Sequence, residues 1–436
     1  MRRSVFIKTF GCQMNAVDSA RMLSLLSSAD YHAAASLDEA DLVLLNTCSI
    51  RDKADQKIYS ELGKLRRWKQ SRKGRLVGVG GCLAQQAGES LRARAPHEDI
   101  VFGTHNIARL PEMVRNASAR RPSMAVSMEG DTGHWDVPPH LPGGAVSAMV
   151  TIMQGCDNFC AYCIVPLVRG REVSRRAADV LAEIRALADR GVREVILLGQ
   201  NVNSYGRKEG EIPFHELLRR IAGFSMVARI RFITSHPRDL DDRTVAVFRE
   251  IEALCPHVHL PLQSGSDRVL AAMGRGYTRK EYLSKLDALR KTRPGMTFSS
   301  DFIVGFPGET EEEFRETLHA MEEVRYDSSF SFRFSPRPGT RAAEMDGMVD
   351  PEIAGERLQK LQALQDRHTR ERLAGMVGRE VEVLTEGESA KGGGRLCGRT
   401  PCHKTVNFIP ADGGGPFRKV LVTSAGAHSL AGEERG

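Results

Sequence analysis

Short apolar runs alternate with helical patterns over the first part of the chain. The strand-like runs cover residues 4–10, 41–46 and 75–80. Apolar positions recur at helical spacing over residues 19–28, 52–68 and 83–93. Because strands that alternate with helices usually pair in parallel, the pattern predicts a small parallel α/β domain at residues 1–118.

The alternation resumes over residues 146–372. Candidate strands cover residues 146–153, 194–199, 229–234, 257–262, 297–304 and 328–334. Two of the intervening helices open with the capping-box pattern, at Thr278 with Glu281 and at Thr310 with Glu313. Repeated strand–helix units of this kind close wholly or partly into a parallel barrel, so we predict a partial (β/α)6 barrel.

The two remaining segments differ from these domains in composition. Residues 119–145 lack periodicity and are rich in proline and glycine, which predicts a linker. Residues 375–436 change to short strand-like runs at 380–384, 395–399, 404–409 and 418–423, with glycine clusters at the turns. This pattern predicts a small β-barrel. A chain of 436 residues is too long for one ordinary core, so an α/β protein of several domains is expected.

The net charge of +7 is concentrated in one segment. Residues 51–75 contain ten Lys and Arg against three acidic residues, a difference of 10 − 3 = +7. Within this segment Ile58, Leu62, Leu65 and Trp68 recur at helical spacing and predict an apolar inner face. The basic outer face has two interpretations of equal weight. It either contacts the phosphates of a polyanionic partner or is a solvated helix surface.

Residues 1–30 lack the long apolar core of a signal peptide, and no apolar stretch reaches the roughly 20 residues of a membrane helix. We therefore expect a cytoplasmic protein. In a reducing compartment, clustered thiols indicate metal ligands rather than disulfides, and the nine cysteines are an odd number.

The first group of cysteines is Cys12, Cys48 and Cys82, each just beyond a predicted strand. The carboxyl ends of parallel strands meet at one edge of a sheet, so these three side chains are expected to form one site. The alternative is three separate buried cysteines, which are common core residues. A cluster here would have only three protein ligands.

The second group is Cys156, Cys160 and Cys163, with the spacing C-x3-C-x2-C after the first barrel strand. Three thiolates this close can bind three irons of a cubane iron–sulfur cluster and leave the fourth iron without a protein ligand. A cluster with an open iron indicates chemistry, because a cluster for electron transfer normally has four protein ligands.

Polar and glycine-rich runs follow four later strands of the predicted barrel. They lie at residues 199–203, 234–237, 263–266 and 305–309. Each run alone is typical of a turn. Together, at the carboxyl ends of the strands, they indicate a ligand pocket.

The C-x3-C-x2-C loop of the partial barrel resembles the radical S-adenosylmethionine (SAM) superfamily. With the upstream cysteines, nearly the whole chain resembles the methylthiotransferases, and the motifs are closest to the MiaB type. The sequences TFGCQMN at residues 9–15, NTCSIR at 46–51, RGREVSR at 169–175 and TSHP at 234–237 agree with that type. Leu167-Val168 and residues 399–404 of the expected TRAM barrel depart from it. These departures put fine RNA contacts in doubt and leave the cluster chemistry intact.

This resemblance implies radical methylthiolation at C2 of N6-isopentenyladenosine at position 37 of tRNA. It implies two SAM molecules and two 4Fe-4S clusters, one bound by Cys156, Cys160 and Cys163 and an auxiliary one, the sulfur carrier, by Cys12, Cys48 and Cys82. By the same analogy, candidates for holding SAM are Gln200, Asn201, Ser235, Gln263 and Gly305. Each of these has a turn-forming or pocket-lining role as its alternative. Tyr162 is a candidate for contact with the adenine or for packing.

The resemblance also implies a tRNA partner, held by the TRAM barrel and the basic helix, and a reductant such as flavodoxin or ferredoxin. We expect a monomer. No acid–base pair is expected, because an aromatic C–H is not acidic, so His236 is interpreted as structural or substrate-side. The alternatives are the sister activities on threonylcarbamoyladenosine tRNA or ribosomal protein S12. A further alternative, of a different class, is a non-catalytic iron–sulfur RNA-binding protein.

Overall fold

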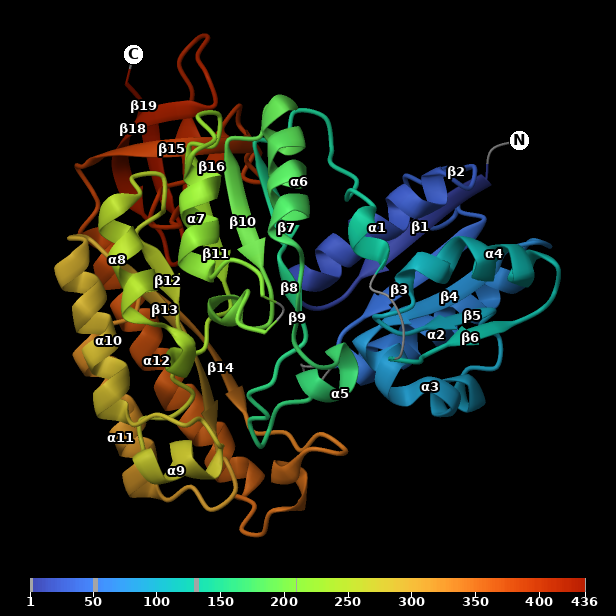
Figure 1. Cartoon of the computed structure of the whole chain (residues 1–436), viewed down its shortest axis with the longest axis horizontal. Helices are drawn as coiled ribbons and strands as arrows, with labels where there is room; N and C mark the ends of the chain where they lie inside the picture. Colours follow the sequence, from blue (N-terminus) through green and yellow to red (C-terminus); the bar gives the residue numbers. More distant parts are fainter. Residues whose placement is uncertain (1–2, 50–53, 129–132, 209, 436) are drawn as a thin grey trace. The chain divides into compact units, whose positions relative to one another are not determined.

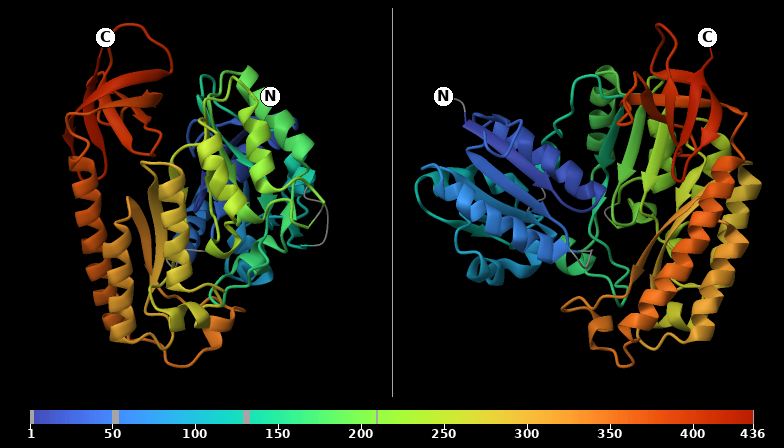
Figure 2. Two further views of the ribbon diagram at one scale, coloured as in Figure 1. Left: turned by 60° about the vertical axis from the view of Figure 1, so that its left-hand side comes forward. Right: turned by 180° about the vertical axis from the view of Figure 1, so that it is seen from behind.

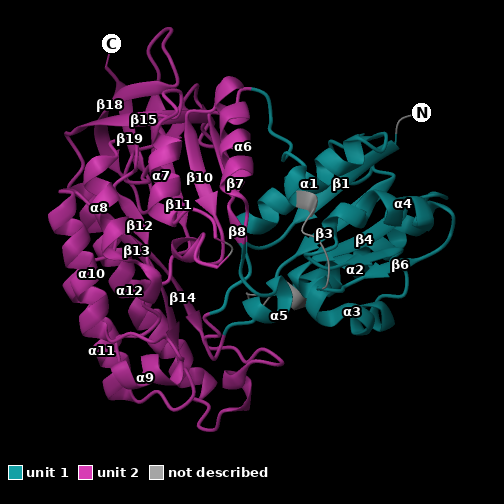
Figure 3. Ribbon diagram, in the orientation of Figure 1, with its two compact units in different colours: residues 1–143, 154–157, 163–173 teal, residues 144–153, 158–162, 174–436 magenta. Residues whose placement is uncertain are grey.

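The computed structural model describes residues 3–49, 54–128, 133–208 and 210–435. The chain forms two compact units, coloured separately in Figure 3. Unit 1 contains residues 1–143, 154–157 and 163–173, and unit 2 contains residues 144–153, 158–162 and 174–436. The chain passes from one unit to the other within the short strands β8 (Met153–Gln154) and β9 (Val173–Ser174).

Unit 1 is built on a parallel six-stranded sheet of order β2-β1-β3-β4-β5-β6 (Figure 1). Its strands are β1 (Arg3–Thr9), β2 (Tyr31–Ala33), β3 (Leu42–Thr47), β4 (Leu76–Gly81), β5 (Ile100–Phe102) and β6 (Ser123–Ala125). Its α-helices are α1 (Gln13–Ser27), α2 (Ala54–Gln70), α3 (Cys82–Arg94), α4 (Leu110–Ser118) and α5 (Val165–Arg169). Short 3-10 helices cover Ile107–Arg109 and Gly133–Asp136. The predicted parallel α/β domain is confirmed.

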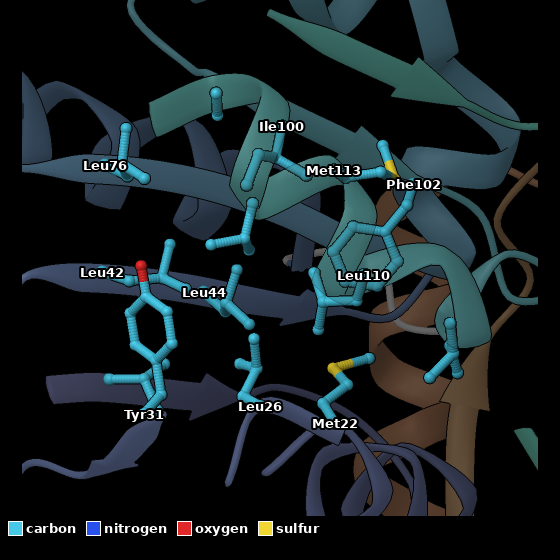
Figure 4. Packing of buried hydrophobic residues seen from close by; sticks show 14 of the residues in the cluster. Met22, Leu26, Tyr31, Leu42, Leu44, Leu76, Ile100, Phe102, Leu110 and Met113 are labelled. Carbon is cyan, nitrogen blue, oxygen red and sulfur yellow. The ribbon is translucent and has the colours of Figure 1, made fainter. Parts of the chain in front are cut away.

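Both faces of this sheet are apolar, as the continuous hydrophobic sequences of β3 and β4 require. One face packs Leu44 and Phe102 against Met22 and Leu26 of α1 (Figure 4). The other packs against α2, whose inner residues Ile58, Leu62, Leu65 and Trp68 are buried as predicted. Burial of each such side chain contributes about 1.5–3 kcal/mol, so these two helical layers stabilise the sheet.

The structure differs from the prediction in the start of one helix and in three short strands that were not predicted. Helix α1 begins at Gln13, six residues before the predicted start, directly after Cys12. Strands β2, β5 and β6 have three residues each, too few to show an alternating pattern. Strand β6 lies in the segment predicted as a linker and pairs with β5. The expected start of the basic helix, at residues 52–53, lies outside the described residues.

Unit 2 contains six parallel strands in two sheets, β11-β10-β7 and β12-β13-β14. A bridge between Ile230 and Leu254 joins the chain before β12 to β11, which continues the curve of a partial barrel. The strands are β7 (Ser147–Thr151), β10 (Glu194–Leu198), β11 (Arg229–Ile233), β12 (His257–His259), β13 (Thr297–Val304) and β14 (Ser328–Arg333). All six coincide with predicted strands, and β12 is shorter than expected.

Helices cover the outside of this partial barrel (Figure 2). They are α6 (Ala177–Asp189), α7 (Phe214–Ala222), α8 (Asp242–Glu250), α9 (Asp267–Ala272), α10 (Arg279–Thr292), α11 (Glu311–Val324) and α12 (Pro351–Ala374). The 3-10 helices of this unit cover Val202–Ser204, Pro237–Asp239 and Arg341–Glu344. Both predicted capping boxes are present, at the starts of α10 and α11. Among the described residues, no helix is both long and apolar enough to cross a lipid bilayer.

Helix α12 leads into a closed five-stranded barrel of order β15-β16-β17-β19-β18. Its strands are β15 (Glu380–Glu388), β16 (Leu396–Arg399), β17 (Thr405–Ile409), β18 (Phe417–Ala425) and β19 (Leu430–Glu434). The barrel core contains Val383, Phe408 and Leu430. The expected C-terminal barrel is confirmed, and β19 was not predicted.

Two buried arginines of β11 hold the β16–β17 turn of this barrel. Arg229 donates to the carbonyl of Arg399 at 2.7 Å, and Arg231 donates to those of Thr400 and Pro401 at 2.7 and 2.8 Å. The segment that departs from the MiaB pattern therefore packs against the partial barrel.

A histidine in the same turn leads us to expect that the folded protein is less stable in acid. The His403 ring stacks on that of His257, 5.7 Å between centroids. Burial, with nearby cations such as Arg231, lowers the pKa of His403 to about 3, and burial first lowers that of His257 well below 6.5. Both pKa values lie below those of the unfolded chain. Their contribution to stability is therefore complete above pH 6.5. It decreases as the pH is lowered below that value, by at most about 1.4 kcal/mol per pH unit for each histidine.

Hydrogen exchange of residues 396–409, corrected for intrinsic rates, should accelerate between pH 7 and pH 5. The double variant His257→Gln/His403→Gln should show a smaller pH dependence. An equal pH dependence in both proteins would contradict the assignment to these histidines.

Candidate active site

The cysteines of unit 1 follow three neighbouring strands. Cys12 follows β1, Cys48 follows β3, and Cys82 follows β4 as the first residue of α3. The three strands are adjacent and parallel, with Thr9 opposite Asn46 and Thr47 opposite Gly81. The structure therefore brings the cysteines to one edge of the sheet, as predicted. They are called the auxiliary cysteine site below.

Two glycines with positive φ allow these turns to approach each other. Gly11 has φ +113°, and a Cβ there would lie 2.8 Å from Sγ of Cys48. Gly81 has φ +93°, and a Cβ there would lie 2.4 Å from the carbonyl oxygen of Thr47. Any other residue would be strained at these angles and would also collide with the neighbouring turn. The Gly-Cys pairs thus place the cysteines close together.

Asn15 joins the first two turns. Its amide nitrogen donates to the carbonyls of Phe10 and Thr47, at 2.9 Å each. Its Oδ1 lies 3.7 Å from Sγ of Cys12. The asparagine of the TFGCQMN sequence therefore holds the ends of β1 and β3 together beside the thiol.

Arg169, the last residue of α5, lies in the same part of unit 1. Its Nη2 donates to Oδ1 of Asn15 at 2.9 Å and to Oδ2 of Asp18 at 2.7 Å. Its side chain is 3 % exposed. The pKa of Arg169 stays above its ordinary value, because Asp18, Cys82 and Cys12 outweigh the burial that opposes its charge. Burial raises the pKa of Cys82, and Arg169 opposes that effect.

The second cysteine group spans a unit boundary in the chain. Cys156 and Cys163 belong to unit 1 and Cys160 to unit 2. In unit 1 the backbone N–H of Cys156 donates to the carbonyl of Gly170 at 3.3 Å. In unit 2 the N–H of Ala161 donates to the carbonyl of Met273 at 2.8 Å. A backbone bond thus fixes Cys156 in unit 1, and another fixes Ala161, the residue after Cys160, in unit 2.

Two buried side chains of unit 2 face the Cys160 sulfur. Nη1 of Arg275 lies 3.4 Å from Sγ, and Nε2 of His236 lies 3.8 Å from it. Arg275 is held by Tyr277, by the carbonyl of Pro261 and by the hydroxyl of Tyr162 at 3.3 Å. A charged donor fixed in this way places positive charge on one ligand of the expected cluster.

His236 acts here as a hydrogen-bond donor. Its Nδ1 accepts from the backbone N–H of Arg238 at 3.2 Å, so the neutral ring has its proton on Nε2, toward Cys160. Burial, with Arg275 and Arg238, lowers the pKa of His236 to about 2. The interpretation of His236 as a structural or substrate-side residue stays a prediction.

The SAM candidates lie at the strand ends where they were expected, with different environments. Asn201 is committed to Asp239, at 2.7 Å, and to the N–H of His236, at 3.1 Å. Ser235 Oγ and Gln263 Oε1 are buried and have no hydrogen-bond partner among the described residues. Gly305 has φ +70°, and its N–H donates to Glu309 at 2.6 Å. Gln200 is half-buried after β10.

Three buried polar residues near the cysteine groups or the strand ends were not among the candidates from the sequence. Arg169 and Arg275 lie at the two cysteine groups, and Asn203 is buried with neither amide atom bonded within the described part of the chain. Asn203 gave a signal as a member of a polar run after a strand, and Arg169 as the first residue of the RGREVSR sequence, although neither signal indicated its role. Both arginines are far in sequence from the cysteines that they face.

Within the described residues, no group of three or more His, Cys, Asp or Glu is arranged to hold a single metal ion. A cubane cluster makes a different demand, since each cysteine binds a different iron. At the auxiliary cysteine site, Nη1 of Arg169 is buried without a hydrogen-bond partner in the part of the chain that the structure describes. An unpaired cationic donor beside thiols fits an anionic cluster bound by thiolates.

Two family descriptions match the chain. Residues 4–103 match "Uncharacterized protein family UPF0004", and residues 150–321 match the "Radical SAM superfamily". Among solved structures, the radical SAM methyltransferase TsrM from Kitasatospora setae has a TM-score of 0.59 at 16 % identity. The alignment covers 79 % of this chain and 77 % of that one, and it supports the fold.

Curated relatives match nearly the whole length of the chain. The tRNA-2-methylthio-N(6)-dimethylallyladenosine synthase of Geobacter metallireducens is 51 % identical over 98 % of both chains. The enzyme of that name from Syntrophus aciditrophicus is 48 % identical over 99 % of this chain and 94 % of its own. With two groups of three cysteines on a radical SAM fold, the chain belongs to the family of tRNA-2-methylthio-N(6)-dimethylallyladenosine synthases.

Proposed function

We propose that this protein attaches a methylthio group to C2 of N6-isopentenyladenosine at position 37 of tRNA. The observation that carries the proposal is the presence of two separate three-cysteine groups, each with a buried arginine beside one of its sulfurs. One cluster with an open iron suffices for radical formation. Delivery of sulfur accounts for a second cluster with an open iron.

In this proposal, Cys156, Cys160 and Cys163 hold the radical cluster, and the auxiliary cysteine site holds the second one. When bound, these groups and SAM supply a carbon radical that can remove hydrogen from an aromatic C–H, together with the sulfur that replaces it. Arg275 and His236 fix the Cys160 thiolate.

The contacts of the candidates for holding SAM suggest different roles for them. Ser235 and Gln263 have buried oxygens without a hydrogen-bond partner among the described residues, and these oxygens can accept from the polar groups of SAM. Asn201 shapes the pocket through Asp239. Gly305 allows close approach of backbone, and Gln200 borders the same strand ends.

The basic face of α2 supports a role in binding tRNA. Several of its cations are engaged within unit 1, for example Lys69 with Asp99 at 2.6 Å. Arg66 and Arg67 are exposed. Arg66 also lines a hollow of about 710 Å³ with Tyr59 and Arg94. Exposed cations around a hollow can bind phosphate without reading sequence. The C-terminal barrel is the second proposed tRNA surface, and we propose a cytoplasmic monomer served by flavodoxin or ferredoxin.

The test is a single-turnover reaction of anaerobically reconstituted protein with dithionite, SAM and tRNA containing isopentenyladenosine. Nucleoside mass spectrometry should detect 2-methylthio-isopentenyladenosine. The matched control is the same tRNA without the isopentenyl group. If 5′-deoxyadenosine forms without that nucleoside, the substrate is wrong, and threonylcarbamoyladenosine tRNA or ribosomal protein S12 would be tested instead.

Arg275→Met should slow reductive cleavage of SAM by about 10- to 100-fold, the usual cost of removing a partner of a metal ligand. Arg275→Lys should fall between the two proteins, since lysine keeps the charge but not the forked geometry. The measurement is 5′-deoxyadenosine formation without tRNA, normalised to iron content. Wild-type cleavage by the methionine variant would contradict a role at Cys160.

A further inference from the structure

Helix α5 is a short element that unit 1 holds firmly. Ile164 and Val168 pack against Cys82 in one buried cluster. The carbonyl of Val168 accepts a hydrogen bond from Oγ1 of Thr104 at 2.6 Å. Arg169 follows directly, so its backbone is fixed next to the Cys82 turn.

The Arg169 side chain is buried and only partly satisfied. Its Nη2 is shared between Asn15 and Asp18, both on α1, and the Asp18 carboxylate is 2 % exposed. Nη1 of Arg169 and Oδ1 of Asp18 are both buried without a hydrogen-bond partner among the described residues. A buried guanidinium is costly unless its donors are used, so the free Nη1 indicates an anionic acceptor that completes the site.

The contacts around Arg169 identify that acceptor. Val168, the residue before Arg169, packs against Cys82, and Asn15 lies between Arg169 and the Cys12 sulfur. Asp18 supplies one negative charge to the guanidinium. A cluster on the auxiliary cysteine site would supply the second at the free nitrogen.

We propose that Arg169 is a positioning residue that donates its free N–H to a thiolate of the auxiliary cysteine site and raises the reduction potential of the cluster held there. A hydrogen bond and a fixed positive charge on a ligating sulfur favour the reduced, more negative cluster. Asp18 limits the effect, because it shares the same guanidinium. The inference rests on the proposed auxiliary cluster.

A purely structural role predicts something different. If the Arg169–Asp18 pair only joined α5 to α1, replacing either residue would lower stability and leave the potential unchanged. If the two residues act through their charges, replacing them should shift the reduction potential in opposite directions. Removal of Arg169 should make the potential more negative, and removal of the Asp18 charge should make it more positive.

The experiment uses full-length protein in which Cys156, Cys160 and Cys163 are all alanine, so that only the auxiliary cluster is loaded. The reduction potential is measured by EPR-monitored titration with dithionite, with iron content and circular dichroism recorded for each protein. Arg169→Gln should change the equilibrium constant for one-electron reduction about tenfold, a shift of about 59 mV to more negative potential. Arg169→Lys should recover most of the shift.

Asp18→Asn gives the second arm, with a shift toward positive potential expected, and remains informative if Arg169→Gln does not fold. Arg229→Gln is the matched control, since Arg229 is also a buried arginine paired with a carboxylate, Glu382, but in unit 2. It should leave the potential unchanged. Unchanged potentials in both Arg169→Gln and Asp18→Asn at full iron content would overturn this inference and leave the proposed auxiliary cluster standing. No iron in this background would overturn the auxiliary cluster itself.

Discussion

Replacing Cys160 with alanine will abolish both 5′-deoxyadenosine formation and methylthiolation, to the level of an enzyme-free control. Cys160 is the buried member of its group, and its sulfur accepts from two fixed donors, Arg275 at 3.4 Å and His236 at 3.8 Å. Without the sulfur, the proposed radical cluster would lose one of its three proposed protein ligands, and both donors would lose their acceptor. The iron that remains should be that of the auxiliary cluster, about four per chain instead of eight.

Cys255→Ala is the matched control for this experiment. Cys255 is also buried in unit 2, at 4 % exposure, and belongs to neither cysteine group. Its loss removes one sulfur from the core, at a cost of roughly 1 kcal/mol, and activity should be retained. Wild-type 5′-deoxyadenosine formation by Cys160→Ala would show that the C-x3-C-x2-C loop does not hold the radical cluster.

The sequence predicted the positions of the cysteines better than their surroundings. Buried parallel strands have continuous apolar sequences, so β1, β3 and β4, and with them the edge that carries Cys12, Cys48 and Cys82, could be located within one residue. The short strands and the early start of α1 could not, because three residues or a polar first turn carry no periodic signal.

The buried arginines were unpredictable for a different reason. Arg169 meets Asn15 across 154 positions of sequence, and Arg275 meets Cys160 across 115. Such contacts depend on how the elements pack, and no local spacing encodes them. The contacts of Arg229 and Arg231 with the carbonyls of residues 399–401 are equally long-range, and they do not depend on the side chains at those positions.

Replacing Cys82 with alanine will abolish methylthiolation while reductive cleavage of SAM continues. Cys82 begins α3, is 2 % exposed and packs against Ile164 and Val168. Alanine is a good helix former and fills most of that space, so the fold should persist. The auxiliary cluster would lose a ligand, and the protein would form a radical without sulfur to transfer. Cys12→Ala and Cys48→Ala should behave in the same way.

The measurement is the ratio of 2-methylthio-isopentenyladenosine to 5′-deoxyadenosine in one reaction, because that ratio separates sulfur delivery from radical formation. Cys397→Ala, a half-buried cysteine of the C-terminal barrel, should leave the ratio at the wild-type value. Full methylthiolation by Cys82→Ala would mean that sulfur reaches the adenine without the auxiliary cysteine site. Loss of both products would mean that this site also supports radical formation, and the division of roles between the two cysteine groups would then be wrong.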